Sequence, residues 1–157
     1  MKIGFIDYYL DEYHANHYPQ WIKNAAGDVC AFYAWAQTDS PKGGLTTAAW
    51  CEKYGAVRCG SIEEVCRICD FLIILSPDNP EYHLSYAERV FPFAKPVFMD
   101  KTFAPDTDTA LKITELAKRC NTPLFSSSSL RFCSEFEGIE RADSALPFGT
   151  GHNFEIE

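Results

Sequence analysis

The sequence predicts an α/β domain, a three-layer sandwich in which helices cover both faces of a mostly parallel sheet of about six strands. From the first residues, short apolar segments alternate with amphipathic helical segments, which is the pattern of repeated β–α units. The segment Asp70–Leu75 is continuously apolar after its first residue, as in a strand covered on both faces. We therefore expect this strand at the centre of the sheet.

The other strands are expected wherever a short apolar or aromatic run is bounded by turn residues. In chain order the expected strands are Lys2–Ile6, Val29–Ala36, Val57–Cys59, Asp70–Leu75, Lys95–Met99 and a last strand that opens at Thr122–Phe125.

Capping residues mark the helices between these strands. Because Pro19 is tolerated only near a helix start, Asn16 is the expected N-cap of the first helix, and Gly27 its end. Ser61 and Glu64 form a capping box, in which each side chain bonds a free backbone N–H of the other residue. The remaining helix starts are expected at Thr46 or Thr47, after Pro80, and at Asp106 or Asp108.

Composition limits the classes of function. A chain of 157 residues with 46% apolar residues can close one domain core without disulfides or metals. Its 22 acidic residues outnumber 14 basic ones, and no run of like charge stands out, which argues against a nucleic-acid or membrane surface. We expect a small-molecule or protein partner, and a homo-oligomer is also compatible with the sequence.

Cysteine usage and the first residues favour a cytoplasmic protein. The seven cysteines are odd in number and lie mostly in apolar or helical contexts, as reduced thiols do. Cys66 and Cys69 have CxxC spacing without a second ligand pair, and His14 and His17 share a helix face without an evident third ligand, so no metal is expected. Met1 leads straight into a strand rather than into a leader segment, and no run reaches membrane-spanning length.

Ligands of an open parallel sheet bind at the carboxyl ends of its strands. After the first strand, a dinucleotide-binding protein would show G-x-G-x-x-G, because backbone amides must approach a pyrophosphate closely. This chain has no glycine between Gly4 and Gly27. Asp7, Asp11 and Glu12 instead bring negative charge to that turn, which argues against ordinary NAD binding.

Three later segments, each following an expected strand, carry a family resemblance. They are Ser76-Pro-Asp-Asn-Pro-Glu-Tyr-His83, Lys95-Pro-Val-Phe-Met-Asp-Lys101 and Thr122-Pro-Leu-Phe-Ser-Ser-Ser-Ser-Leu-Arg-Phe132. Together they resemble the N-terminal, NAD(P)-binding Rossmann domain of the Gfo/Idh/MocA oxidoreductases, over roughly Ile3 to Phe132.

The resemblance implies hydride transfer between NAD or NADP and a secondary alcohol of a sugar or polyol. It implies a catalytic role for Lys101, with Asp100 where glutamate is commoner in the family. It also implies that the loop with Ser76, Pro77, Asn79 and His83 lines the nicotinamide-ribose region.

Position alone suggests three further cofactor-binding candidates. Asp7 ends the first strand, Asp39 follows the second as the nearest candidate for a ribose-binding carboxylate, and Ser127 lies in a serine run at the ligand edge. Ser127 also has a structural explanation, as part of a polar strand end that satisfies its own backbone, and Asp39 lies in a loop of uncertain register.

We expect residues 1–132 to form the Rossmann-like domain and residues 133–157 to be a tail or the stump of a second α+β domain. Without that second domain and the glycine turn, independent catalysis is not expected. The alternative function is a non-catalytic binding or interaction protein on a Rossmann scaffold that has lost dinucleotide binding.

Overall fold

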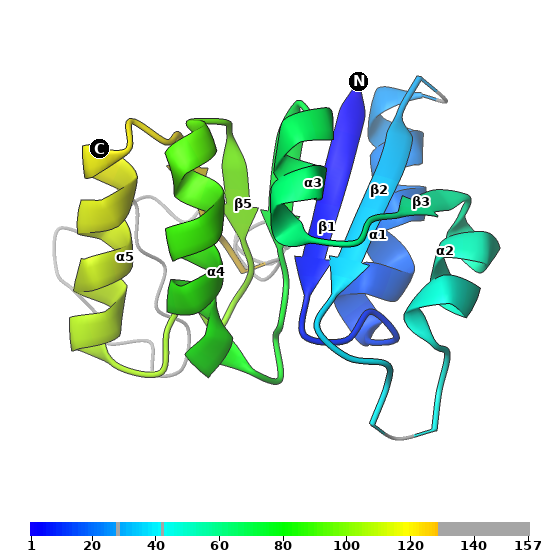
Figure 1. Cartoon of the computed structure of the whole chain (residues 1–157), viewed down its shortest axis with the longest axis horizontal. Coiled ribbons are helices and arrows are strands. Elements are labelled where there is room, and N and C mark those ends of the chain that lie inside the picture. The colour runs from blue at the N-terminus through cyan, green and yellow to red at the C-terminus, as the bar shows by residue number, and fades with distance from the viewer. Residues whose placement is uncertain (28, 42, 129–157) are drawn as a thin grey trace, which may run out of the picture.

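A six-stranded parallel sheet forms the middle layer of the chain (Figure 1). The computed structural model describes residues 1–27, 29–41 and 43–128. The strand order is β3-β2-β1-β4-β5-β6, the Rossmann order, so the expected α/β sandwich is confirmed, and its sheet is parallel throughout. The strands are β1 Lys2–Asp7, β2 Ala31–Ala36, β3 Ala56–Arg58, β4 Phe71–Ile74, β5 Val97–Met99 and β6 Leu124–Phe125.

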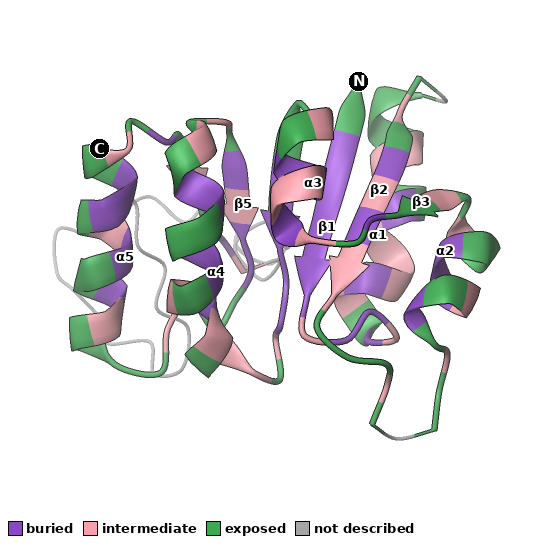
Figure 2. Cartoon of the chain, in the orientation of Figure 1, coloured by how far each residue is buried: buried purple, intermediate pink, exposed green. Residues whose placement is uncertain are grey.

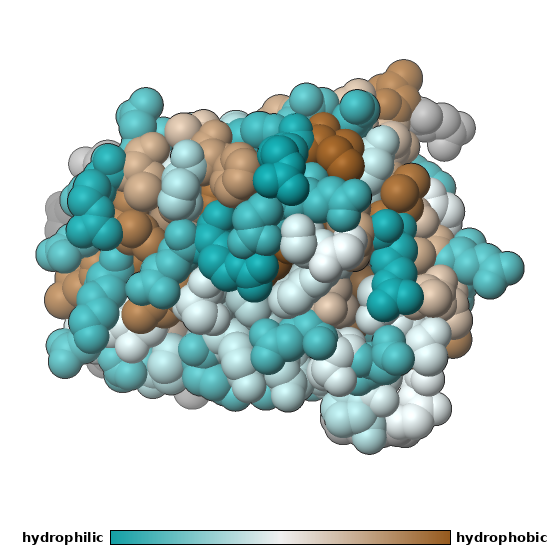
Figure 3. All heavy atoms as spheres, in the orientation of Figure 1, coloured by the Kyte–Doolittle hydropathy of each residue, from teal (hydrophilic) through white to brown (hydrophobic). Residues whose placement is uncertain are grey.

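Helices lie on both faces of the sheet. α3, α4 and α5 cover one face, and α1 and α2 lie on the other, over the β1–β3 half (Figure 1). Hydrophilic side chains run over the outer surface of α4 and α5, interrupted by small apolar areas (Figure 3). The helices are α1 Tyr13–Ala26, α2 Thr47–Tyr54, α3 Ile62–Ile68, α4 His83–Val90 and α5 Thr107–Arg119, with 3-10 turns η1 Pro80–Tyr82 and η2 Phe91–Phe93.

The core consists of two apolar clusters, one on each face of the sheet. In β4, Leu72 and Ile74 belong to the cluster under α3, α4 and α5, whereas Ile73 belongs to the cluster under α1 and α2. β1 and β4 are buried along most of their length, whereas the edge strand β3 is mostly exposed (Figure 2). The continuously apolar strand is thus an interior strand with both faces covered, as the sequence predicts.

The first helix starts earlier than expected. Glu12, not Asn16, is the N-cap of α1, and Pro19 lies inside the helix. The Glu12 carboxylate accepts hydrogen bonds from the first-turn amides, whereas Asn16 bonds the side chains of Asp11 and Trp50 instead. The sequence rule for Pro19 failed because a helical proline costs one backbone hydrogen bond, which the packing of this buried residue offsets.

Most other caps are as predicted. Gly27 ends α1 at a φ of 75°, and Thr46, Ser61 and Asp106 cap α2, α3 and α5 with side-chain oxygens. Glu64 bonds the amide of Gly60 rather than that of Ser61, so only half of the expected capping box forms. β2 begins at Ala31 rather than Val29, because Val29 is 72% exposed and outside the ladder with β1.

The expected tail, residues 133–157, lies outside the described residues. Within the described part of the chain, no helix is long and apolar enough to cross a membrane.

Candidate functional site

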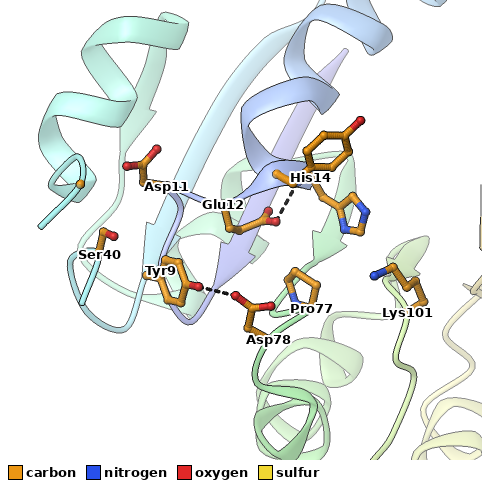
Figure 4. A pocket seen from close by; sticks show the side chains of 10 residues that line it. Tyr9, Asp11, Glu12, His14, Ser40, Pro77, Asp78 and Lys101 are labelled. Carbon is orange, nitrogen blue, oxygen red and sulfur yellow. Dashed lines mark hydrogen bonds between the residues drawn. The ribbon is translucent and has the colours of Figure 1, made fainter. Parts of the chain in front are cut away.

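A pocket opens at the carboxyl edge of the sheet, where a Rossmann fold binds its ligands. The loops after β1, β2, β4 and β5 enclose a volume of about 460 Å³ (Figure 4). Its lining residues are mostly polar: Tyr9, Asp11, Glu12, Tyr13, His14, Ser40, Gly44, Pro77, Asp78 and Lys101.

The loop from β1 to α1 has the length of the dinucleotide fingerprint but none of its glycines. With the first glycine position placed on Asp7, where β1 ends, the G-x-G-x-x-G spacing puts the other two on Tyr9 and Glu12. In a dinucleotide site these positions keep the turn tight and leave room for the pyrophosphate. Here each of the three carries a side chain with a specific contact.

Asp7 ties the end of β1 to the loop after β4. Its Oδ1 accepts hydrogen bonds from the amides of Tyr8 and Ser76, at 2.7 and 2.9 Å, and from the Ser76 hydroxyl at 3.1 Å. Its Oδ2 is buried and has no hydrogen-bond partner among the described residues. Burial, and then the charge of Glu12, raise the pKa of Asp7 well above its usual value, which favours the neutral acid.

Tyr9 closes the loop onto the other side of the pocket. Its hydroxyl donates to Asp78 Oδ2 at 2.5 Å, and its side chain is 6% exposed (Figure 4). The bond to Asp78, followed by burial, raises the pKa of Tyr9. A tyrosine ring therefore fills the position at which the fingerprint would have a glycine.

Glu12 occupies the N-terminus of α1. Its carboxylate accepts the amide of His14 at 2.7 Å and the amide of Ala15. Burial raises the pKa of Glu12, while these two hydrogen bonds act in the opposite direction. The first-turn amides that a Rossmann protein offers to pyrophosphate are thus taken by the chain's own carboxylate.

Asp11 binds the loop after β2 to the same turn. Its Oδ2 accepts the amide of Leu45 at 2.8 Å, and its Oδ1 accepts the Asn16 side chain at 3.0 Å. These bonds lower the pKa of Asp11. The close approach of this loop to the Asp11 carboxylate requires a glycine at position 44, because a Cβ on Gly44 would lie 2.1 Å from Asp11 Oδ2.

At the other end of the pocket, His14 pairs with Asp100. Nδ1 of His14 faces Oδ2 of Asp100, and the two side chains are 14% and 1% exposed. Asp100 also accepts the amide of Lys101 at 2.8 Å through Oδ1. The contact with the Asp100 carboxylate raises the pKa of His14, against the effect of burial.

Lys101 lies beside this pair. It follows β5, is exposed and lines the pocket, and its ammonium points to the side on which His14 lies (Figure 4). Asp11 and Ser40 lie at the opposite end in the same view. The carboxylates of Asp11, Glu12 and Asp78 therefore line the pocket from that end to its middle, and the Lys101 ammonium lies at the other end (Figure 4).

Of the predicted site residues, Pro77 and Lys101 line the pocket directly. Asp7 and Ser76 lie just beneath it, bonded to each other. Asn79 is outside the lining, where its amide donates to Glu81 Oε1 at 3.1 Å.

Three further predicted residues lie apart from the pocket and have structural contacts. His83 is fully buried, with Nδ1 at 2.9 Å from the carbonyl oxygen of Phe103 and Nε2 against that of Leu75. Ser127 is buried and donates to the carbonyl oxygen of Ser128 at 3.2 Å. Asp39 accepts the amide of Thr47 at 2.7 Å at the start of α2.

His14 was considered from sequence only as a metal ligand with His17. His17 Nδ1 instead lies 2.6 Å from the carbonyl oxygen of Tyr13, and no group of three metal-ligating side chains occurs in residues 1–27, 29–41 and 43–128. The sequence signal that could have identified His14 is its place in the first turn of α1, next to the phosphate-binding position.

The fold and this loop arrangement define a Rossmann-type domain, and structural comparison shows which proteins it is most like. No family model and no curated protein sequence matches the chain. Among solved structures, it matches the N-terminal Rossmann domain of Gfo/Idh/MocA oxidoreductases, so the resemblance expected from the motifs is confirmed at the level of fold.

Three of these structures illustrate the match. The WlbA dehydrogenase from Bordetella pertussis, solved with NADH and UDP-GlcNAcA, has a TM-score of 0.69 at 15% identity, over 87% of this chain and 39% of that one. A Gfo/Idh/MocA family oxidoreductase from Vibrio cholerae has a TM-score of 0.64 at 19% identity, over 81% of this chain and 38% of its own. Biliverdin reductase from Synechocystis, solved with biliverdin and NADP+, has a TM-score of 0.62 at 16% identity, over 80% of this chain and 37% of that one. The chain therefore spans less than half the length of these proteins.

Proposed function

We propose that this chain is a small-molecule-binding domain on a Rossmann scaffold that does not hold NAD or NADP through the usual pyrophosphate turn. The observation that carries the proposal is the Glu12 carboxylate on the first-turn amides of α1. Those amides are the group that the fold normally presents to phosphate.

The residues of the turn do not fit a pyrophosphate. A phosphate at the start of α1 would have to displace a carboxylate that makes two backbone hydrogen bonds there. It would also approach Asp11 and Asp78 in the same pocket. A helix N-terminus favours an anion by only about 0.3–2 kcal/mol, so it does not offset the repulsion from these carboxylates.

Calorimetry with NAD+, NADH, NADP+ and NADPH tests the proposal on the whole chain. We expect a dissociation constant of about 1 mM or weaker for each. In Glu12→Ser, a short neutral N-cap remains and the charge is removed, so affinity for NADH should rise while the helix is kept. Micromolar binding of any of these dinucleotides by the unaltered chain would contradict the assignment. A Glu12→Ser variant that folds but shows no higher affinity for NADH would contradict it too.

A second candidate is the NAD(P)-dependent oxidoreductase that the resemblance implies, acting on a sugar or polyol. It is favoured by Lys101, which lines the pocket beside Asp100, and by likeness to proteins solved with NADH or NADP+. On this proposal Lys101 and Asp100 are catalytic, and Asp7, Asp39, Ser76, Pro77, Asn79, His83 and Ser127 form or support the cofactor site.

The second candidate has its own test. With NAD(P) and a panel of sugars and polyols, the chain should reduce the cofactor, and Lys101→Ala should lower turnover about 100-fold with cofactor affinity largely kept. Unchanged turnover in that variant would show that Lys101 takes no part in the chemical step.

A further inference from the structure

His14 lies beside Asp100 and Lys101, and its place in this group is not explained by the chain's resemblance. His14 comes from the first turn of α1, and the other two residues follow β5. The ring of His14 and the ammonium of Lys101 lie on one side of the pocket (Figure 4). Asp100 is buried behind His14 and holds its Nδ1.

This pairing fixes which ring nitrogen faces a ligand. Because Nδ1 is taken by the carboxylate of Asp100, Nε2 is the nitrogen left for the pocket. No hydrogen bond to Nε2 is made within the described ranges 1–27, 29–41 and 43–128. A histidine with one nitrogen on a buried carboxylate and the other directed at a ligand is the arrangement of a general acid–base.

We propose that His14 is a general acid–base in this pocket, that Asp100 is its positioning residue, and that the substrate is an uncharged α-hydroxycarbonyl compound. The inference deepens the proposed function, since it assigns a chemistry to the same small-molecule pocket. It requires no dinucleotide.

The reaction is a proton transfer without net oxidation. Nε2 of His14 removes the proton from the carbon that bears the substrate hydroxyl, and the electrons of that C–H bond form the C=C bond of an enediolate. The electron pair of the carbonyl π bond moves onto oxygen, where the Lys101 ammonium stabilises the negative charge. Return of the proton from His14 to the same carbon regenerates the hydroxycarbonyl compound. Transfer of the hydroxyl proton to the enediolate oxygen, followed by proton delivery from His14 to the other carbon, gives its isomer.

The rest of the lining favours a neutral, hydroxyl-rich substrate. Asp78 and Glu12 offer acceptor oxygens, and Ser40 offers a hydroxyl that both donates and accepts. The same carboxylates repel a phosphorylated sugar, as they repel a dinucleotide. Dihydroxyacetone, a small uncharged α-hydroxyketone, is therefore the probe.

The experiment follows exchange of the C–H protons of dihydroxyacetone for deuterium by proton NMR, with the whole chain in D2O. The chain should accelerate exchange above the buffer rate, and His14→Gln should lower this acceleration about 100-fold. His17→Gln is the matched control, because His17 lies on the same helix outside the pocket lining and should leave the rate unchanged.

Two further variants separate catalysis from folding. Lys101→Met should lower the rate while the melting temperature is kept, since Lys101 is exposed. Asp100→Asn should lower the rate and move the midpoint of its pH profile to lower pH, because Asp100 raises the pKa of His14. No acceleration by the unaltered chain, or equal rates in the His14 and His17 variants, would overturn the inference. Because the assay contains no NAD(P), failure here leaves the calorimetric result on dinucleotides unaffected.

Discussion

Buried carboxyl groups around the pocket differ in how their charge is balanced. Asp100 faces His14, and Glu12 bonds the start of α1. Asp7 has three donors on one oxygen and none on the other among the described residues. Burial, followed by the charge of Glu12, raises the pKa of Asp7 well above its usual value, so the structure favours the neutral acid at this position.

Asparagine should therefore replace Asp7 well. A raised folded-state pKa gives stability that is present below the usual carboxyl pKa and lost as pH rises through the raised value. Because asparagine cannot ionise, the Asp7→Asn variant does not lose this stability as pH rises. The melting temperature of the variant should therefore exceed that of the unaltered chain by roughly 3 °C or more at pH 8. Thermal unfolding from pH 4 to pH 8 measures the difference, which should shrink toward pH 4. A variant less stable than the parent at pH 8 would show that Asp7 is ionised.

His14 is the basic partner of the buried carboxylate of Asp100. Its pKa is raised mainly by Asp100, so the pair's stability is present below about 6.5 and is lost as pH rises through the raised value. An NMR titration of the His14 ring should give a pKa above 6.5, and Asp100→Asn should lower it. Identical titration curves for His14 in the two proteins would exclude the pairing.

At the scale of elements, α3 packs directly on β1 at Gly4. A Cβ on Gly4 would lie 2.3 Å from Val65 Cγ1 and 3.1 Å from Cys69 Sγ, both in or next to α3. Close helix–strand packing of this kind is one of the uses of glycine in the fold.

Gly4→Ala should destabilise the chain by about 1–3 kcal/mol through overpacking. The matched control is Gly60→Ala, where the nearest heavy atom to a new Cβ is Glu64 Oε2 at 3.4 Å. Urea denaturation should show a lower midpoint for the Gly4 variant and little change for the control. Equal midpoints would mean that α3 moves freely relative to β1.

The sequence predicts helix ends most accurately where a single capping residue sets them. Ser61, Thr46, Asp106 and Gly27 mark helix ends through their own side chains or backbone freedom. Ser61 and Gly27 were identified outright, and Thr46 and Asp106 were each one of two predicted alternatives. The predicted start of α1 was wrong, because glutamate is an uncommon N-cap and the rule for Pro19 indicates a later start.

At the scale of the whole molecule, the parallel sheet and its ligand edge followed from the β–α alternation and the apolar strand β4. The side-chain contacts within the site were harder to predict from the sequence. His14 meets Asp100, and Tyr9 meets Asp78, only because parallel strands bring separate loops to one edge. Pairings between distant loops leave no local pattern. Lys101 was identified because it lies in a segment that resembles a family motif, whereas its neighbour His14 lies in none.

In the proposed function, Glu12 takes the amides that would otherwise bind a pyrophosphate. The most direct measurement follows the backbone amide resonances of His14 and Ala15 in the whole chain as NADH is added to millimolar excess. Because both amides already bond Glu12, we expect no saturable shift of either resonance. Saturable shifts of both, with a dissociation constant below about 100 µM, would show that the dinucleotide displaces Glu12 and would contradict the account.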